Sequence, residues 1–149
     1  MTDGGTLRID RATTADIPLL AALNLELYED ERHPYPMELP ALTERMARWV
    51  AGEYRVLLFR RAHRVTGYAV WRDEEFGAYL RQFFICRDQR RQGFGRAAMK
   101  LLCRDEFPKG RPLHLESSVW NTGAIAFWHA LGLQDSGLSM VLKPGERLK

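Results

Sequence analysis

The sequence has few cysteines and no long apolar stretch. Its two cysteines, Cys86 and Cys103, fit neither a zinc site nor a redox pair, so we expect no metal and two buried free thiols. No apolar run approaches the roughly 20 residues that span a bilayer. The N-terminus also has no charged-then-apolar leader pattern. These absences predict a cytoplasmic protein that makes no contact with a membrane.

Internal repeats, low-complexity tracts and linkers are lacking as well. We therefore expect one domain over residues 1–149, which is long enough to bury a proper core. The composition, 46% hydrophobic and 28% charged, is ordinary for a soluble globular protein.

Charge is distributed unevenly along the chain. Residues 81–111 hold nine Lys and Arg against three Asp and Glu, whereas the rest of the chain holds thirteen against sixteen. A basic centre in a mildly acidic chain indicates one anionic ligand bound at one place. Nucleic acid is the rival partner, but no recognised nucleic-acid motif accompanies the arginines, so we expect none.

The basic centre follows a predicted strand and opens a predicted helix. Residues 79–86 are rich in aromatic and β-favouring residues, whereas apolar residues recur at helical spacing from Phe94 onward. In the turn between them, Gly93 and Gly95 would let backbone N–H groups at the helix start approach a pyrophosphate. A plain turn with solvating arginines is the alternative. A dinucleotide fingerprint fits less well, because Glu116 does not lie at the tip of the next predicted strand.

Alternating hydrophobicity, capping residues and turn residues predict the remaining elements. The predicted elements are a strand over 6–11, a helix capped by Thr13 and Asp16, a helix through 42–50, a hairpin pairing 56–60 with 65–71, a strand over 112–118, a helix capped by Asn121 with a Schellman stop at Gly132, and a last strand through Leu138, Met140 and Leu142. The order β-α-α-β-β-β-α-β-α-β predicts an α/β (α+β) fold, a mixed sheet with helices on both faces.

Two motifs, in this order, resemble the GNAT superfamily of N-acetyltransferases. Arg90-x-x-Gly93-x-Gly95 is similar to its Q/R-x-x-G-x-G/A acetyl-CoA signature. The stretch Asn121-x-x-Ala124-x-x-Phe127-Trp128 is similar to its N-x-x-A-x-x-F-Y segment. The element order also matches that family over nearly the whole chain. The resemblance implies an enzyme that moves an acetyl group from acetyl-CoA directly to a primary amine of a small molecule or protein.

The resemblance also assigns residues to the cofactor. Backbone groups of 83–85 would hold the pantetheine arm like an added strand, where the central strand parts from the strand over 112–118. Backbone N–H groups of 91–96 would bind the pyrophosphate. Asn121 matches a cofactor-contacting position, although a plain helix cap is an equal interpretation. The implied cofactor-binding residues are Phe83, Phe84, Ile85, Arg90, Arg91, Gln92, Gly93, Phe94, Gly95, Arg96, Asn121 and Trp128.

Catalysis requires an amine without its extra proton. A lysine-type amine costs about 4–5 kcal/mol to deprotonate at pH 7, so a general base is useful. Glu116 is the candidate, because it matches a glutamate used as base in the ribosomal-protein alanine acetyltransferases. Its alternatives are orienting the substrate or pairing with Arg81. His114 is a second titratable residue on the same predicted strand.

Trp128 departs from the family pattern. Many members have a tyrosine there that protonates the leaving thiolate, and an indole N–H is no acid at neutral pH. Trp128 would then wall the acetyl site or donate a hydrogen bond. The thiolate would take its proton from solvent or from Ser118, Tyr79 or His129. The missing tyrosine also leaves open a catalytically weak acyl-CoA-binding sensor.

The acceptor is not identified by the sequence. In the family, the end of the first helix borders the acceptor site, and here it is acidic, with Glu26, Glu29, Asp30 and Glu31. These carboxylates would attract a cationic amine, or they form a solvated surface. The sequence leaves a homodimer open.

Overall fold

Five strands form one mixed sheet in the spatial order β1-β2-β3-β4-β5. The computed structural model describes residues 5–149, in two compact units, Met1–Ser118 and Val119–Lys149. The first unit contains β1 (Arg8–Arg11), α1 (Ile17–Glu31), α2 (Leu39–Arg48), β2 (Arg55–Arg61), β3 (Arg64–Glu74), β4 (Gly77–Ile85), α3 (Phe94–Leu101) and β5 (Leu113–His114). The short helical turns η1 (Thr14–Asp16), η2 (Trp49–Glu53) and η4 (Leu102–Glu106) adjoin α1, α2 and α3, and η3 (Arg87–Gln89) lies between β4 and α3. The second unit contains α4 (Thr122–Ala130).

Strand pairing confirms the predicted mixed sheet. Neighbouring strands from β1 to β4 are antiparallel, whereas β4 and β5 are parallel and pair over only two residues of each strand. The predicted hairpin forms between β2 and β3, with Ala62 at φ 52° in its turn. A bulge interrupts β4, because Gln82 pairs with Val70 and Leu80 pairs with Trp71, leaving Arg81 as the extra residue.

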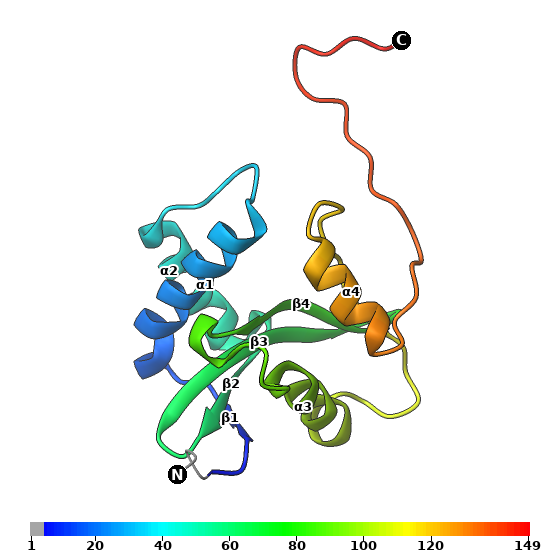
Figure 1. Cartoon of the computed structure of the whole chain (residues 1–149). Helices are drawn as coiled ribbons and strands as arrows, with labels where there is room; N and C mark the ends of the chain where they lie inside the picture. Colours follow the sequence, from blue (N-terminus) through cyan, green and yellow to red (C-terminus); the bar gives the residue numbers. More distant parts are fainter. Residues whose placement is uncertain (1–4) are drawn as a thin grey trace. The chain divides into compact units, whose positions relative to one another are not determined.

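The helices of the first unit cover both faces of the sheet. Figure 1 shows α1 and α2 over one face and α3 over the other. Apolar side chains alternate between the two faces along β2 and β3, since successive residues of a strand point in opposite directions. The buried cluster on the α1 and α2 side comprises Ala12, Leu20, Leu23, Met46, Trp49, Tyr54, Val56, Leu58, Tyr68, Val70 and Phe84.

Local signals set the helix ends as predicted. The backbone N–H of Thr13 donates to Asp16 Oδ2 at 2.8 Å, which completes the capping box before α1. In the second unit, Asn121 Oδ1 accepts from the N–H of Ala124 at 3.2 Å. That helix ends in the Schellman pattern, where Gly132 N–H donates to His129 O at 3.0 Å and Leu133 N–H to Trp128 O at 3.1 Å.

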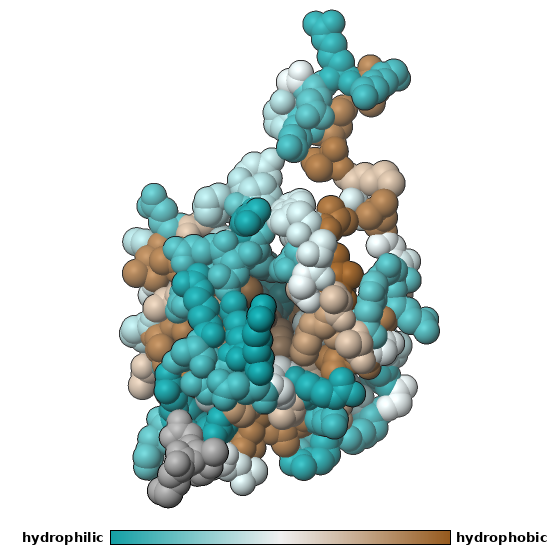
Figure 2. Space-filling model, viewed as in Figure 1, coloured by the Kyte–Doolittle hydropathy of each residue, from teal (hydrophilic) through white to brown (hydrophobic). Residues whose placement is uncertain are grey.

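Three sequence predictions need correction. The strand expected over 112–118 ends at His114, because pairing with β4 stops there. The expected last strand does not form within residues 133–149; a strand needs a hydrogen-bonded neighbour, and Met140 and Val141 are 82% and 75% exposed. Figure 2 shows this apolar surface along the segment that leads to the C-terminus. Cys86 is half-buried, but Cys103 is exposed rather than buried.

Membrane spans and metal clusters are absent from the part of the chain that the structure describes. Within residues 5–149, none of the helices combines the length and apolar character needed to cross a bilayer. The same residues contain no group of three or more His, Cys, Asp or Glu side chains arranged to hold a metal ion.

The close approach of β3 and β4 can be tested by adding a side chain at Gly67. A Cβ added at Gly67 would overlap the Phe84 carbonyl oxygen and lie 3.1 Å from Ile85 Cα. We expect Gly67→Ala to lower the free energy of unfolding by about 1–3 kcal/mol, as overpacking usually does. Gly137→Ala is the matched control, since nothing lies within 4 Å of its added Cβ. Urea unfolding measures both variants, and equal midpoints would contradict the close approach of β3 and β4.

Candidate active site

The start of α3 leaves backbone N–H groups without partners in the helix. Gly93 is its N-cap, with φ 80°, a left-handed conformation that suits glycine. The first backbone bond of the helix runs from Ala97 N–H to Gly93 O at 3.0 Å. The N–H groups of residues 94–96 therefore have no acceptor within the helix. No side chain caps this end and no acidic residue lies in its first turn, so its partial positive charge is uncompensated.

Two arginines before this turn are engaged by the end of α1. Arg90 Nε donates to Ile85 O at 2.8 Å, and its Nη2 donates to Asp30 Oδ2 at 2.6 Å. Arg87 Nη2 donates to Asp30 Oδ1 at 2.9 Å and to Glu29 Oε1 at 3.2 Å. Burial opposes ionisation of Asp30, but the hydrogen bonds from Arg90 and Arg87 prevail and hold the pKa of its carboxyl below the ordinary value.

These ion pairs correct the prediction for the acidic helix end. Glu26, Glu29 and Asp30 neither form a merely solvated surface nor present an uncompensated acidic patch, because Arg87 and Arg90 pair with them. The arrangement anchors the loop before α3 to α1. It also occupies the guanidinium of Arg90, which is therefore less available to a ligand than the backbone N–H groups of the turn.

One edge of β4 loses its neighbour partway along. Only Ala78 and Tyr79 pair with β5, opposite Leu113 and His114. Among residues 5–149, no other strand pairs with this edge of β4. The predicted residues Phe83, Phe84 and Ile85 lie beyond that point, while β3 pairs with the opposite edge. Apart from the Ile85 carbonyl, which accepts from Arg90, backbone groups on the open edge are therefore available to an extended ligand.

Glu116 lies two residues after β5, on the exposed surface. The hydroxyl of Tyr79 donates to Glu116 Oε1 at 2.8 Å. Burial, followed by this hydrogen bond and the charge of Glu116, raises the pKa of Tyr79 to about 12. Within the described chain, no ion pair joins Glu116 to Arg81, so the expected alternative of such a pair is wrong. His114 contacts the carbonyl oxygen of Phe76 at 2.9 Å instead.

Sequence reasoning missed the surroundings of Arg81. Its Nη1 donates to the Tyr54 hydroxyl at 3.1 Å, and its guanidinium lies 5.1 Å from the centroid of the Trp49 ring. Tyr54 and Trp49 come from η2 and the residue after it, far from β4 in the sequence. No local pattern reveals this contact, since it depends on the packing of η2 against the sheet.

The second unit carries the other predicted residues. Asn121 acts as the N-cap of α4, and the ring of Trp128 packs edge-on against Phe127 with centroids 4.8 Å apart. His129 Nε2 lies 2.7 Å from Asp135 Oδ1. Asn121 thus has the capping role that was one of its two interpretations, and its cofactor role stays a prediction.

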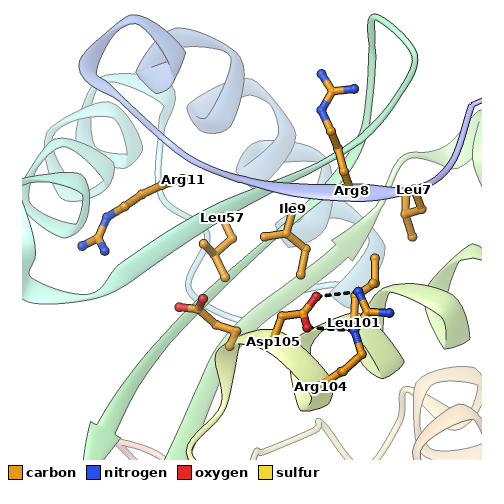
Figure 3. Close-up of a pocket in the computed structure, with 9 residues that line it drawn as sticks. Leu7, Arg8, Ile9, Arg11, Leu57, Leu101, Arg104 and Asp105 are labelled. Carbon is orange, nitrogen blue, oxygen red and sulfur yellow. Dashed lines mark hydrogen bonds and ion pairs between the residues drawn. The ribbon is translucent and has the colours of Figure 1, made fainter.

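A pocket of about 290 Å³ lies elsewhere, beside β1 and η4 (Figure 3). Apolar side chains of Ile9, Leu57 and Leu101 line it, and Arg104 pairs with Asp105 at its rim at 2.6 Å. None of the predicted site residues lines this pocket. We therefore do not consider this pocket the candidate active site.

The comparisons with known proteins agree with this geometry. The sequence profile described as the acetyltransferase (GNAT) family matches residues 21–133. The chain belongs to this family of N-acetyltransferases, whose members use acetyl-CoA. The match spans the boundary between the two compact units. No curated protein matches the chain.

Solved structures share the fold. An aminoglycoside N-acetyltransferase, AAC(6')-Iy, solved in complex with CoA, superposes with a TM-score of 0.74 at 14% identity, over 95% of this chain and 97% of that one. An acetyltransferase from Thermus thermophilus gives 0.73 at 23% identity, over 87% of each chain. The ribosomal-protein-S18-alanine N-acetyltransferase from Escherichia coli gives 0.66 at 24% identity, over 89% of this chain and 80% of that one.

The Tyr79–Glu116 contact can be tested by titration. Glu116→Gln removes the negative charge beside the phenol, so the pKa of Tyr79 should fall from about 12 while staying above its ordinary 10, because burial is the larger cause. Ultraviolet absorbance of the phenolate, with Tyr79→Phe used to assign the signal, measures the change. An unchanged titration curve in Glu116→Gln would contradict the contact.

Proposed function

We propose that this protein transfers an acetyl group from acetyl-CoA directly to a primary amine of a small molecule or protein, with Glu116 as the general base. The observation that carries the proposal is the position of Glu116. It follows β5 at the point where β5 leaves the edge of β4, and it is exposed to solvent. A cosubstrate lying along that open edge would bring its thioester beside the carboxylate.

The cofactor role of the central strand and turn rests on backbone groups. The open edge of β4 at Phe83, Phe84 and Ile85 suits the amides of a pantetheine arm, which would add to the sheet as a short strand. The uncapped start of α3, from Gly93 to Arg96, suits the pyrophosphate. Arg91 and Gln92 are exposed beside it and can approach phosphate oxygens.

The chemistry assigned to Glu116 follows from its hydrogen bond. Oε1 accepts from the neutral Tyr79 phenol, which fixes the orientation of the carboxylate. Its other oxygen can accept a proton from an incoming ammonium, directly or through one water. The free amine then attacks the thioester carbonyl and forms the C–N bond, the C–S bond breaks as the CoA thiolate leaves, and the nitrogen loses its second proton to solvent as the amide forms.

A second candidate function is an acyl-CoA-binding sensor that catalyses transfer weakly, and Trp128 in place of the family's tyrosine favours it. Thiol release with a panel of amines distinguishes the two. An enzyme releases CoA faster when an amine is added. A sensor binds acetyl-CoA with the same affinity and shows no amine-dependent release.

The phosphate-binding turn can be tested through charge alone. Gly93 adopts φ 80°, which Asn and Asp tolerate better than other residues, and nothing lies within 4 Å of an added Cβ. Gly93→Asp should weaken acetyl-CoA binding about tenfold to hundredfold relative to Gly93→Asn, because only the former places a negative charge beside the pyrophosphate. Calorimetry measures both. Equal affinities in the two variants would remove this turn from the cofactor site.

The base can be tested through the pH dependence of turnover. Glu116→Gln preserves shape but removes the proton acceptor, so turnover at neutral pH should fall about 10²–10⁴-fold, with little change in acetyl-CoA affinity. At high pH the amine deprotonates unaided, and the two proteins should converge. A variant that keeps near-normal turnover at neutral pH, with the best amine found, would show that Glu116 is not the base.

A further inference from the structure

Two side chains of opposite charge lie on one face of the sheet without pairing. Tyr79 packs against the buried cluster that contains Trp49 and Tyr54, and Arg81 stacks on those two rings. Glu116 is hydrogen-bonded to the Tyr79 hydroxyl. Besides burial, both charges act on the Tyr79 phenol, because Glu116 raises its pKa and the positive charge of Arg81 lowers it. Within residues 5–149, neither forms an ion pair.

The bulge in β4 contributes to this arrangement. Gln82 pairs with Val70 and, like it, faces the buried cluster, where it accepts a hydrogen bond from Tyr68 at 2.8 Å. The extra residue Arg81 faces the same side, so two consecutive residues of one strand share a face, which regular alternation does not permit. The bulge thereby aims an arginine toward the side of the sheet where Tyr79 meets Glu116.

The guanidinium of Arg81 is held in place but not neutralised. It lies 5.1 Å from the centroid of the Trp49 ring and 5.6 Å from that of Tyr54, and it donates Nη1 to the Tyr54 hydroxyl at 3.1 Å. Its remaining donors meet no acceptor among the described residues, and the side chain is exposed. Two other arginines have partners for their guanidinium groups. Arg72 pairs with Glu74 at 3.0 Å, and Arg45 donates to Asn24 and Tyr28.

We propose that Arg81 binds the α-carboxylate of the acceptor, so that the amine substrate is a free α-amino acid. This inference rests on the function proposed above, because Glu116 must take the proton from the α-ammonium of the same molecule. A zwitterion places its ammonium against Glu116 and its carboxylate against Arg81, which satisfies both charges at once. The planar guanidinium of Arg81 matches the geometry of a carboxylate better than a point charge does. Stacking on two aromatic rings fixes its orientation before the substrate binds.

The ion pairs at the end of α1 argue against a polycationic acceptor. Glu26, Glu29 and Asp30 pair with Arg87 and Arg90, so these three carboxylates are already engaged and are less able to bind a polyamine. Arg81, whose charge acts on the same phenol as that of Glu116, forms no ion pair among the described residues. Charge complementarity on this face therefore favours a substrate with a carboxylate beside its amine.

The test compares α-amino acids with their α-amides. Calorimetry on the CoA-loaded protein should show the best-bound amino acid binding at least tenfold more tightly than its amide. Arg81→Gln should weaken binding of the acid about tenfold to hundredfold, the usual effect of losing charge-assisted hydrogen bonds, and leave the amide within twofold. Arg81→Lys should retain part of the preference. The control Arg48→Gln removes an exposed arginine of α2 that pairs with Glu53 and should change neither affinity.

Outcomes separate this inference from the proposed function. Amides that bind as tightly as acids, an acid preference that survives Arg81→Gln, or the absence of amino-acid binding would each overturn it. If the amino-acid inference fails in one of these ways but amines without a carboxylate still cause thiol release, the proposed acetyltransferase function is supported. An acid preference that depends on Arg81, without amine-dependent thiol release for any substrate, supports the site and contradicts the proposed reaction. Unchanged CoA and amide affinities in Arg81→Gln show that the variant is folded.

Discussion

Backbone hydrogen bonds hold β4 to β3 along most of its length, but on the other edge they join it to β5 at only two residues, Ala78 and Tyr79. The divergence of two parallel neighbours inside a sheet exposes main-chain donors and acceptors that a regular sheet would satisfy internally. It also ends β5 close to Glu116, so that a side chain can lie beside the open edge. Both halves of the proposed reaction depend on this interruption of the β4–β5 ladder.

The ion pairs between the end of α1 and the basic centre determine which arginines there are free to contact a ligand. Arg87 and Arg90 belong to the stretch with the highest density of arginine, yet Asp30 and its neighbours on α1 engage both. Such pairs on a partly exposed surface contribute little to stability. Their effect here is positional, because they fasten the loop before α3 to the first helix. The start of α3 has no capping side chain or acidic residue, and Arg81 forms no ion pair among the described residues, so both keep their positive charge.

Much of the fold could be predicted because its signals are local. The capping box at Thr13, the cap at Asn121 and the Schellman stop at Gly132 each depend on residues within a few positions, and each formed as predicted. The last predicted strand failed because alternation around Met140 identifies a surface that suits a sheet, whereas a strand also needs a neighbour.

In the candidate site, too, features with a local sequence signal could be predicted, whereas features that depend on distant contacts could not. The turn at Gly93 was predictable from glycine spacing before a helix, since backbone conformation there limits the residue types allowed. The bulge at Arg81 carries no glycine or other marker, and the contacts of Arg81 with Trp49 and Tyr54 join distant segments. The pairing of Asp30 with Arg87 spans 57 residues and depends on how α1 crosses the sheet. Contacts of this kind follow from packing and cannot be derived from a local pattern.

The Tyr79–Glu116 hydrogen bond also limits how the leaving group gains its proton. Tyr79 was among the residues considered as an acid in place of the family's tyrosine. Its pKa of about 12 lies well above the value of about 8.5 typical of a free thiol, so proton transfer from the phenol to a thiolate is unfavourable by more than three orders of magnitude. The same proton is already donated to Glu116. Tyr79 would therefore orient the proposed base and is a poor acid, so a thiolate, already a tolerable leaving group, would take its proton from solvent or from another residue.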